Sequence, residues 1–302
     1  MKRNFIIGLM ICTVLLILGI FLTTNTLEFS QDNIGWNGSS GFFSRLDRHT
    51  TEMITDISAL ETKENTTLLI IAPNESWSGE EIRIIHAFLK RGNTVFLADE
   101  TDTGNSLLSG LGSSIRIGPS YLAGIDRAYN NSSILITSPV QEHPLTRGIG
   151  SLVLDKAKPL TGGTPLIQTG IMSWIDTNND FRISSDESFG RYTVLSQEQM
   201  GNGEIIVLSD SGVFINSMSG IESEYGNGQF LLRCIQYRPN LLIEQIHSRT
   251  ADYSGMGWLF RHIRLDSFLK TMIVLVSLLA CAFLFRKRPP GFSDIGSEPV
   301  MM

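Results

Sequence analysis

The sequence predicts an α/β fold of three layers, in which helices cover both faces of a mostly parallel sheet. Two observations favour this class. An apolar strand, an amphipathic helix and a second apolar strand follow one another at residues 68–99, and so compact a unit requires parallel pairing with a right-handed crossover. Further strands, a late hairpin and a closing helix then complete one domain at residues 41–246, which is the order of an open sheet.

The unit at residues 68–99 carries the clearest local signals. The apolar run 68–72 is typical of a strand that is buried on both faces. Ser78 and Glu81 have the spacing of a capping box, which predicts that a helix begins there. Gly92 ends this helix, and residues 94–99 form the second strand.

Shorter patterns predict the remaining elements. Apolar side chains near helical spacing predict a helix at residues 41–60. The turn Met200-Gly201-Asn202-Gly203, with Asn-Gly as its signal, predicts a hairpin between residues 192–198 and 204–208. Short apolar runs predict strands at 114–117, 133–137, 152–154, 166–168 and 241–246, and helices at 104–112 and 228–237.

Charge and cysteine content exclude two classes of site. The formal net charge is −6, so no nucleic-acid partner is expected. Of the three cysteines, two lie in apolar runs at opposite ends of the chain, which argues against a disulfide framework and a cysteine metal site.

Both ends of the chain resemble membrane spans. Residues 5–22 contain no charged side chain, and residues 268–285 form a second apolar run; about 20 residues cross a bilayer as a helix. Basic residues at both chain termini predict that the termini are cytoplasmic and the middle is extracytoplasmic. A cleaved signal peptide is the alternative for the first run, but this run exceeds the roughly 7–15 residues of a signal core.

The expected protein is therefore a two-pass membrane protein, whose partners are the lipid bilayer and another membrane or envelope protein. The predicted parts are a membrane anchor at 1–24, a spacer at 25–40, the α/β domain at 41–246, a juxtamembrane segment at 247–266, a transmembrane helix at 267–286 and a cytoplasmic tail at 287–302.

The acidic segment at residues 176–187 is the sharpest local motif. Oxygen-bearing side chains stand at the first, third, fifth, ninth and twelfth places of a calcium loop: Asp176, Asn178, Asp180, Ser184 and Glu187. Phe181 occupies the sixth place, where such a loop wants glycine, and the flanks read as strands. The motif indicates either a Ca²⁺ site within a sheet protein or a solvated acidic turn.

Four residues are candidates for ligand binding. Asp210 and Ser211, followed by Asn216, come after the predicted strand 204–208, and open α/β sheets bind ligands at the carboxyl ends of their strands. Their alternative role is to hydrogen-bond loop backbone. His143 follows another strand, but a general base needs a nucleophile nearby, and no Gly-x-Ser-x-Gly pattern is present.

No catalytic residue is assigned from the sequence. None of the five histidines is paired at zinc-ligand spacing, and no glycine-rich dinucleotide or phosphate loop is present. Cys234 lies on a predicted helix face, where a thiol serves packing rather than nucleophilic attack.

Several blocks together resemble the domain of unknown function 4350 family. They are Ser78-Gly-Glu-Glu leading through Phe88-Leu-Lys-Arg-Gly92 to Asp99, His143-Pro-Leu-Thr-Arg-Gly148, Ser173-Trp174 with the acidic loop, and residues 203–216. The resemblance covers residues 41–240 and implies a membrane-anchored, class I glutamine amidotransferase-like or flavodoxin-like domain. No cysteine stands on a strand-to-helix turn, so the Cys-His-Glu chemistry is not carried over. Some relatives are thought to serve transport or cell-envelope assemblies.

Three function hypotheses follow. The first is a non-catalytic domain that binds a partner protein or ligand, in a transport or cell-envelope assembly. The second is a hydrolase or transferase that uses His143, Asp210 and a serine. The third is a calcium-responsive module built on the segment at residues 176–187.

Overall fold

The computed structural model describes residues 25–126, 129–221 and 225–252, together with residues 271, 272 and 275. The described residues between 25 and 252 belong to one compact unit.

Five parallel strands make up one half of the main sheet. In spatial order they are β1 (Thr51–Ile54), β13 (Asn240–Glu244), β2 (Thr66–Ile71), β3 (Thr94–Ala98) and β12 (Gly203–Leu208). The strands β2, β3 and β12 are buried along their whole length, as expected of strands covered on both faces.

The other half of the sheet is antiparallel. It continues from β12 through β11 (Thr193–Met200), β9 (Thr164–Thr169), β6 (Ile134–Pro139) and β7 (Leu152–Asp155), and β8 (Leu160–Thr161) joins β4 (Arg116–Ile117) to β11. A separate pair consists of β5 (Leu122–Gly124) and β10 (Ser173–Ile175). The predicted mostly parallel sheet is therefore wrong: the β11–β12 hairpin reverses the chain direction, and every strand beyond it pairs antiparallel.

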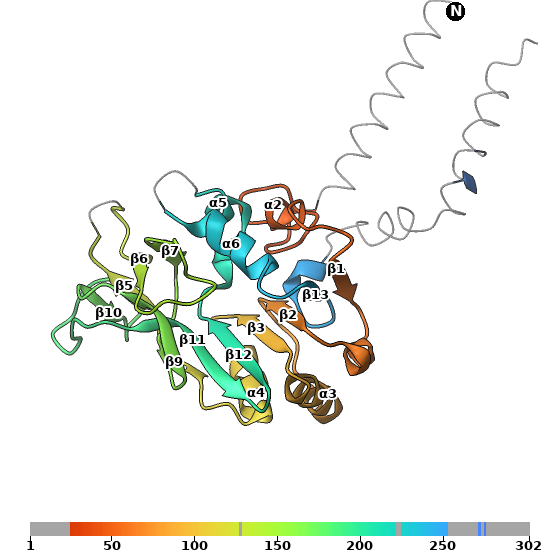
Figure 1. Ribbon diagram of the computed structural model, residues 1–302. Helices are drawn as coiled ribbons and strands as arrows, with labels where there is room; N and C mark the ends of the chain where they lie inside the picture. The colour runs from red at the N-terminus through yellow and green to blue at the C-terminus, as the bar shows by residue number, and fades with distance from the viewer. Residues whose placement is uncertain (1–24, 127–128, 222–224, 253–270, 273–274, 276–302) are drawn as a thin grey trace, which may run out of the picture. The chain divides into compact units, whose positions relative to one another are not determined.

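Helices cover both faces of the parallel half (Figure 1). One face carries α3 (Gly79–Lys90), α4 (Asp102–Leu111) and the 3₁₀ turn η1 (Ile57–Thr62). The other carries α2 (Ser40–Phe43), α5 (Asn216–Ser219), α6 (Asn227–Ile235) and η2 (Ser211–Phe214), and η3 (Arg249–Ala251) follows β13. Leu68 and Ile70 pack in the first layer, Leu69 and Ile71 in the second, because successive strand residues point to opposite faces.

Several predicted elements are confirmed. The Ser78 hydroxyl accepts a hydrogen bond from the Glu81 N–H at 3.3 Å, and the Glu81 carboxylate accepts one from the Ser78 N–H at 2.7 Å, which completes the capping box of α3. The predicted hairpin is β11–β12. Its turn runs from Met200 to Gly203, as predicted, and Gly201 within it adopts a φ of 65°.

The helix predicted at residues 41–60 is wrong. The segment instead contains α2, the edge strand β1 and the start of η1. Pairing of β1 with β13 supplies backbone partners that outweigh the weak helical spacing. The predicted spacer at residues 25–40 is part of the fold, since Phe29 is 4% exposed and the Ser39 N–H donates to the Ser30 carbonyl at 3.1 Å.

The prediction of a two-pass membrane protein with flanking transmembrane helices is corrected. Among the described residues, no helix is both long enough and apolar enough to cross a membrane. The longest described helix, α3, has 12 residues, whereas a span needs about 20. The apolar runs 5–22 and 268–285 lie outside the described residues, apart from residues 271, 272 and 275.

Candidate functional site

The carboxyl ends of the parallel strands bring polar side chains to one edge of the sheet. We call this the carboxyl edge, and it is the edge where open α/β sheets bind ligands. The end of β7 reaches the same edge, since the Asp155 N–H donates to the Asp210 carboxylate at 2.8 Å. The side chains that follow β2, β13, β3 and β12 therefore define the candidate site.

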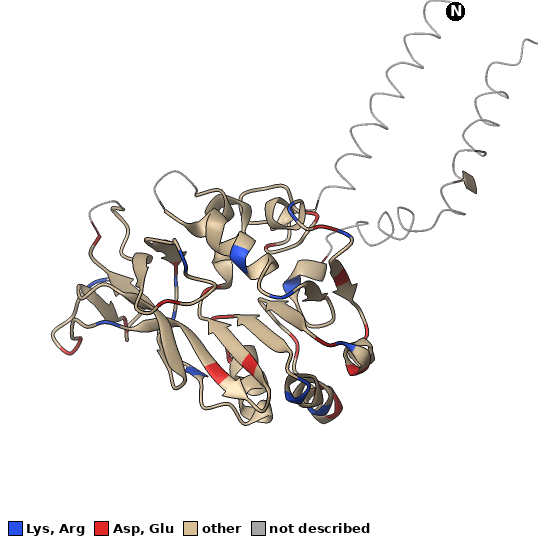
Figure 2. Cartoon of the chain, viewed as in Figure 1, with Lys and Arg blue, Asp and Glu red and all other residues tan. Residues whose placement is uncertain are grey.

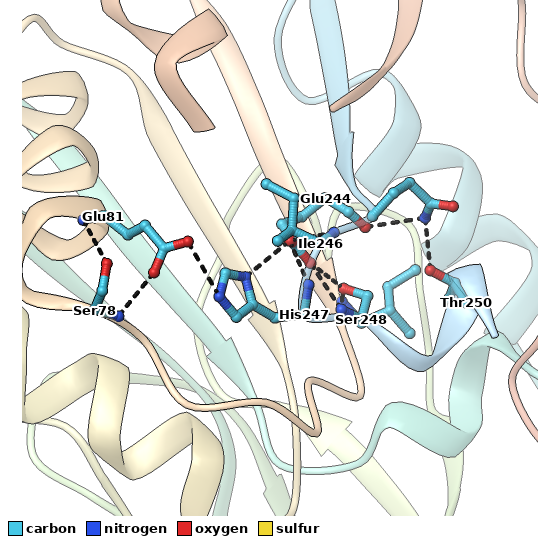
Figure 3. Close-up of polar contacts among 9 residues, drawn as sticks. Ser78, Glu81, Glu244, Ile246, His247, Ser248 and Thr250 are labelled. Carbon is cyan, nitrogen blue, oxygen red and sulfur yellow. Dashed lines mark hydrogen bonds and ion pairs between the residues drawn. The ribbon is translucent and has the colours of Figure 1, made fainter. Parts of the chain in front are cut away.

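Glu244, the last residue of β13, forms the centre of a buried network (Figure 3). Its Oε1 accepts hydrogen bonds from the N–H groups of Ile246 and His247 at 2.6 and 2.7 Å. Its Oε2 accepts from the N–H and hydroxyl of Ser248 at 2.9 and 2.6 Å. The carboxylate thus fixes the sharp turn that follows the strand.

His247 connects this network to the start of α3 (Figure 3). Its Nδ1 lies 3.1 Å from Glu244 Oε1, and its Nε2 lies 3.4 Å from Glu81 Oε1. The ring also stacks on Trp77, with centroids 3.9 Å apart. Burial acts to lower the pKa of His247, but the hydrogen bond to Glu244 and the charges of Glu244, Glu81 and Glu75 outweigh burial and raise it.

The raised pKa predicts a pH dependence of stability. Native His247 holds its proton more tightly than the unfolded chain, where a histidine titrates near about 6.5. The stabilisation is therefore complete below that pH and is lost as pH rises through the higher native value. In urea unfolding, the decline in stability above about pH 6.5 should be steeper in the wild-type protein than in His247→Gln.

Asp99 provides a control for this pH dependence. Burial and the nearby charge of Glu100 raise the pKa of Asp99 to about 7, so the stability linked to Asp99 falls as pH rises from about 4 to about 7. Asp99→Asn should remove this part and leave the decline that is linked to His247, measured as the difference between variants with and without His247. A His247 ring that titrates at or below about 6.5 in an NMR experiment would contradict the prediction.

Asp99, Glu100 and Asp210 lie at the ends of β3 and β12. Asp99 accepts hydrogen bonds from the N–H groups of Thr101 and Gly104 at 3.1 and 2.6 Å, close to the start of α4. Asp210 accepts from the Asp155 and Gly212 N–H groups at 2.8 and 2.7 Å. Complete burial, together with the charge of Glu100, raises the pKa of Asp210 well above its usual value.

The predicted ligand residues Ser211 and Asn216 contact other parts of the chain. The N–H and hydroxyl of Ser211 donate to the Glu100 carboxylate at 2.8 and 2.7 Å. The side-chain amide of Asn216 donates to the Gly35 carbonyl at 2.6 Å, and its oxygen accepts from the Gly41 N–H at 2.7 Å. Asn216 thereby holds the loop of residues 33–38.

His143 lies at the opposite, amino edge of the sheet. It follows β6, which runs antiparallel to β12 across the intervening strands. Its Nε2 lies 3.4 Å from the Tyr237 hydroxyl, and Arg238 pairs with Glu204 at the start of β12. Burial lowers the pKa of His143. The structure therefore does not bring His143 together with Asp210 and Ser211.

The acidic loop at residues 176–187 uses its oxygens on its own backbone. Asp176 accepts from the Asp180 and Phe181 N–H groups at 3.2 and 3.0 Å, and Glu187 accepts from the Thr177 and Ser184 N–H groups at 2.8 and 2.9 Å. Phe181 makes the sharp turn without glycine, at a φ of 54°.

The remaining predicted ligands of this loop also bond within it. The Asn178 amide donates to the Asp180 carboxylate at 3.2 Å and to the Ser184 hydroxyl at 3.3 Å. Within the described part of the chain, no group of three or more His, Cys, Asp or Glu side chains is placed to hold a metal ion. Calcium binding stays a prediction from the sequence.

Sequence reasoning missed two features. The Glu244–His247–Glu81 network joins segments that are distant in sequence, so no local spacing indicates it. The loop of residues 33–38 falls within the predicted spacer, although it contains the large apolar residues Ile34 and Trp36 among Asn and Gly. They are 84% and 70% exposed.

Comparison with known families identifies the domain. The family model described as "Domain of unknown function (DUF4350)" matches residues 31–235. The chain belongs to this family. A comparison with curated proteins found no match.

Solved structures resemble the DUF4350 chain only distantly. The mmIFT52 N-terminal domain is 13% identical, with a TM-score of 0.45 over 60% of this chain and 79% of that one. A β-galactosidase from Bacillus circulans sp. alkalophilus is 12% identical, with a TM-score of 0.34; the match covers 55% of this chain and 22% of that one. The cytoplasmic protein STM3548 from Salmonella typhimurium is 10% identical, with a TM-score of 0.37; the match covers 61% of this chain and 75% of that one.

Proposed function

We propose that this DUF4350 domain is a non-catalytic, amidotransferase-like domain that binds a partner protein. The observation that carries the proposal is that the polar side chains at the carboxyl edge are hydrogen-bonded to nearby parts of the protein itself. Asp99, Asp210 and Glu244 each accept hydrogen bonds from nearby backbone N–H groups, and Ser211 donates its hydroxyl to Glu100. The edge that holds reacting groups in catalytic α/β domains here stabilises its own loops.

The surroundings of the two candidate nucleophiles, Cys234 and Ser211, support the same proposal. Cys234 lies in α6, is 2% exposed, and has its pKa raised by burial, whereas a reactive cysteine needs a lowered pKa and access to substrate. Ser211 donates its hydroxyl to Glu100. Among the described contacts, neither His143, which lies at the amino edge, nor His247, which contacts Glu244 and Glu81, is hydrogen-bonded to Ser211. A hydrolase built on these residues would lack a base beside its nucleophile.

The test is quantitative co-purification of the full chain from cells that carry it naturally. We expect a partner protein at near-stoichiometric amounts, retained equally by the wild type and by Ser211→Ala and His143→Ala. The same preparations should show no hydrolysis of glutamine. Absence of any retained protein, or hydrolysis that Ser211→Ala abolishes, would contradict the proposal.

A further inference from the structure

A cavity lies at the amino edge of the sheet, where β1, β13 and β2 begin. Its volume is about 530 Å³, which is within the range of roughly 300–1,000 Å³ that small-molecule sites occupy. The segments that lead into β1 and β2 form its two walls, and the start of β13 lies between them. The cavity is therefore separate from the candidate site at the carboxyl edge.

The lining of this cavity is polar. Among the described residues that line it, only Leu241 and Leu242 are apolar. The others that matter here are threonines and charged or basic side chains: Thr50, Thr51, Thr62, Thr66, Arg48, His49, Lys63, Glu52 and Glu64. Figure 2 shows acidic and basic residues together around β1 and η1. An apolar ligand would take these groups out of water without pairing them, so the lining favours a polar, charged ligand.

The full charges of the lining form one pair and leave two groups without a partner. Lys63 and Glu52 form an ion pair at 2.5 Å, which connects the two walls and cancels both charges. Arg48 and Glu64 are exposed, and neither side chain has a hydrogen bond or ion pair with another described residue. His49, next to Arg48, can donate a further hydrogen bond. One positive and one negative group thus remain available to a ligand.

These two unpaired groups belong to opposite walls of the cavity. Arg48 precedes β1, Glu64 precedes β2, and β13 lies between the two strands. Neighbouring strands are about 4.8 Å apart, so β1 and β2 are separated by about 10 Å. An extended tripeptide has a length of about 10 Å. A single small molecule therefore pairs with both groups only if it carries an anionic end and a cationic end.

Hydrogen bonds within the protein order both walls. On the first wall, the His49 N–H donates to the Asp47 carboxylate at 2.9 Å. On the second wall, the Thr66 hydroxyl donates to the Glu64 carbonyl at 2.7 Å. A site that is ordered before binding loses little conformational freedom when its ligand arrives, which favours affinity.

We propose that this cavity binds a small zwitterion, with an anionic group at Arg48 and an ammonium group at Glu64. Short peptides with free ends are the chemical class that fits the charges and their separation. Charge-assisted hydrogen bonds at the two ends fix the orientation of such a ligand, and the threonine hydroxyls can bond the peptide groups between them. This binding goes beyond the proposed function and does not depend on it.

The test is isothermal titration calorimetry of the full chain with triglycine, N-acetyltriglycine and triglycine amide. Each of the two blocked peptides lacks one charged end. We expect saturable binding of triglycine, and binding about threefold to fivefold weaker for each blocked peptide, as for the loss of one exposed charge pair. Arg48→Gln should remove the difference between triglycine and triglycine amide. Glu64→Gln should remove the difference between triglycine and N-acetyltriglycine.

Arg147→Gln is the matched control, because Arg147 is 67% exposed and does not line the cavity. It should bind triglycine as the wild type does, and circular dichroism must show that all variants are folded. The absence of saturable binding, or equal binding of the three peptides, would overturn the inference. Binding that requires the carboxylate alone would make the cavity an anion site and would overturn it too. So would an equal loss of binding in Arg147→Gln and Arg48→Gln, which indicates a general effect of charge.

Discussion

Replacement of Glu244 by alanine should lower the free energy of unfolding by about 3–5 kcal/mol, as expected when one partner of a buried charged network is removed. Glu244 is fully buried, and its carboxylate accepts from Ile246, His247 and Ser248. Without it these donors stay buried and unpaired. Of its two carboxylate contacts, His247 would keep only the one with Glu81 in this variant.

Urea unfolding monitored by circular dichroism measures this effect. Glu64→Ala is the matched control, because Glu64 is exposed, and surface changes usually alter stability by less than about 0.5 kcal/mol. Glu244→Gln should be intermediate, since an amide keeps one acceptor oxygen but presents an NH₂ donor to a backbone N–H group on its other side. Equal stability of Glu244→Ala and Glu64→Ala would show that the turn needs no carboxylate.

Local signals explain which parts of the fold could be predicted. The capping box of Ser78 and Glu81 and the hairpin near Gly201 depend on residues a few positions apart, so the sequence contains the whole signal. The buried runs of β2 and β3 likewise follow from their own apolar residues. The predicted parallel pairing of these two strands is confirmed. A single helix between two adjacent strands is the usual crossover connection of a parallel pair.

The parts that could not be predicted depend on distant segments. The strands β6, β7 and β9 are short apolar runs that fit either strand direction, and only their pairing partners make them antiparallel. Asn216 donates to the Gly35 carbonyl, which lies far away in the chain, so its sequence position after β12 does not indicate this contact. The same is true of His247, because the local spacing of its partner Glu81 indicates only a helix cap.

Gly38→Ala should displace the loop of residues 33–38 and lower the stability of the domain. A Cβ atom at Gly38 would lie 1.9 Å from the Asn33 carbonyl oxygen and 2.6 Å from the Asn33 carbonyl carbon. These are backbone atoms, so the segment between residues 33 and 38 must move. Forced overpacking of this kind costs about 1–3 kcal/mol of stability. The hydrogen bond from the Gly38 N–H to the Gly35 carbonyl, at 3.1 Å, is strained by the same movement.

Gly79→Ala is the matched control for this substitution, because nothing lies within 4 Å of a Cβ atom at Gly79. We expect urea unfolding to separate the two variants, with a lower free energy of unfolding in Gly38→Ala and a value close to that of the wild type in Gly79→Ala. Equal stability of Gly38→Ala and Gly79→Ala would show that the loop accepts the added Cβ atom without moving.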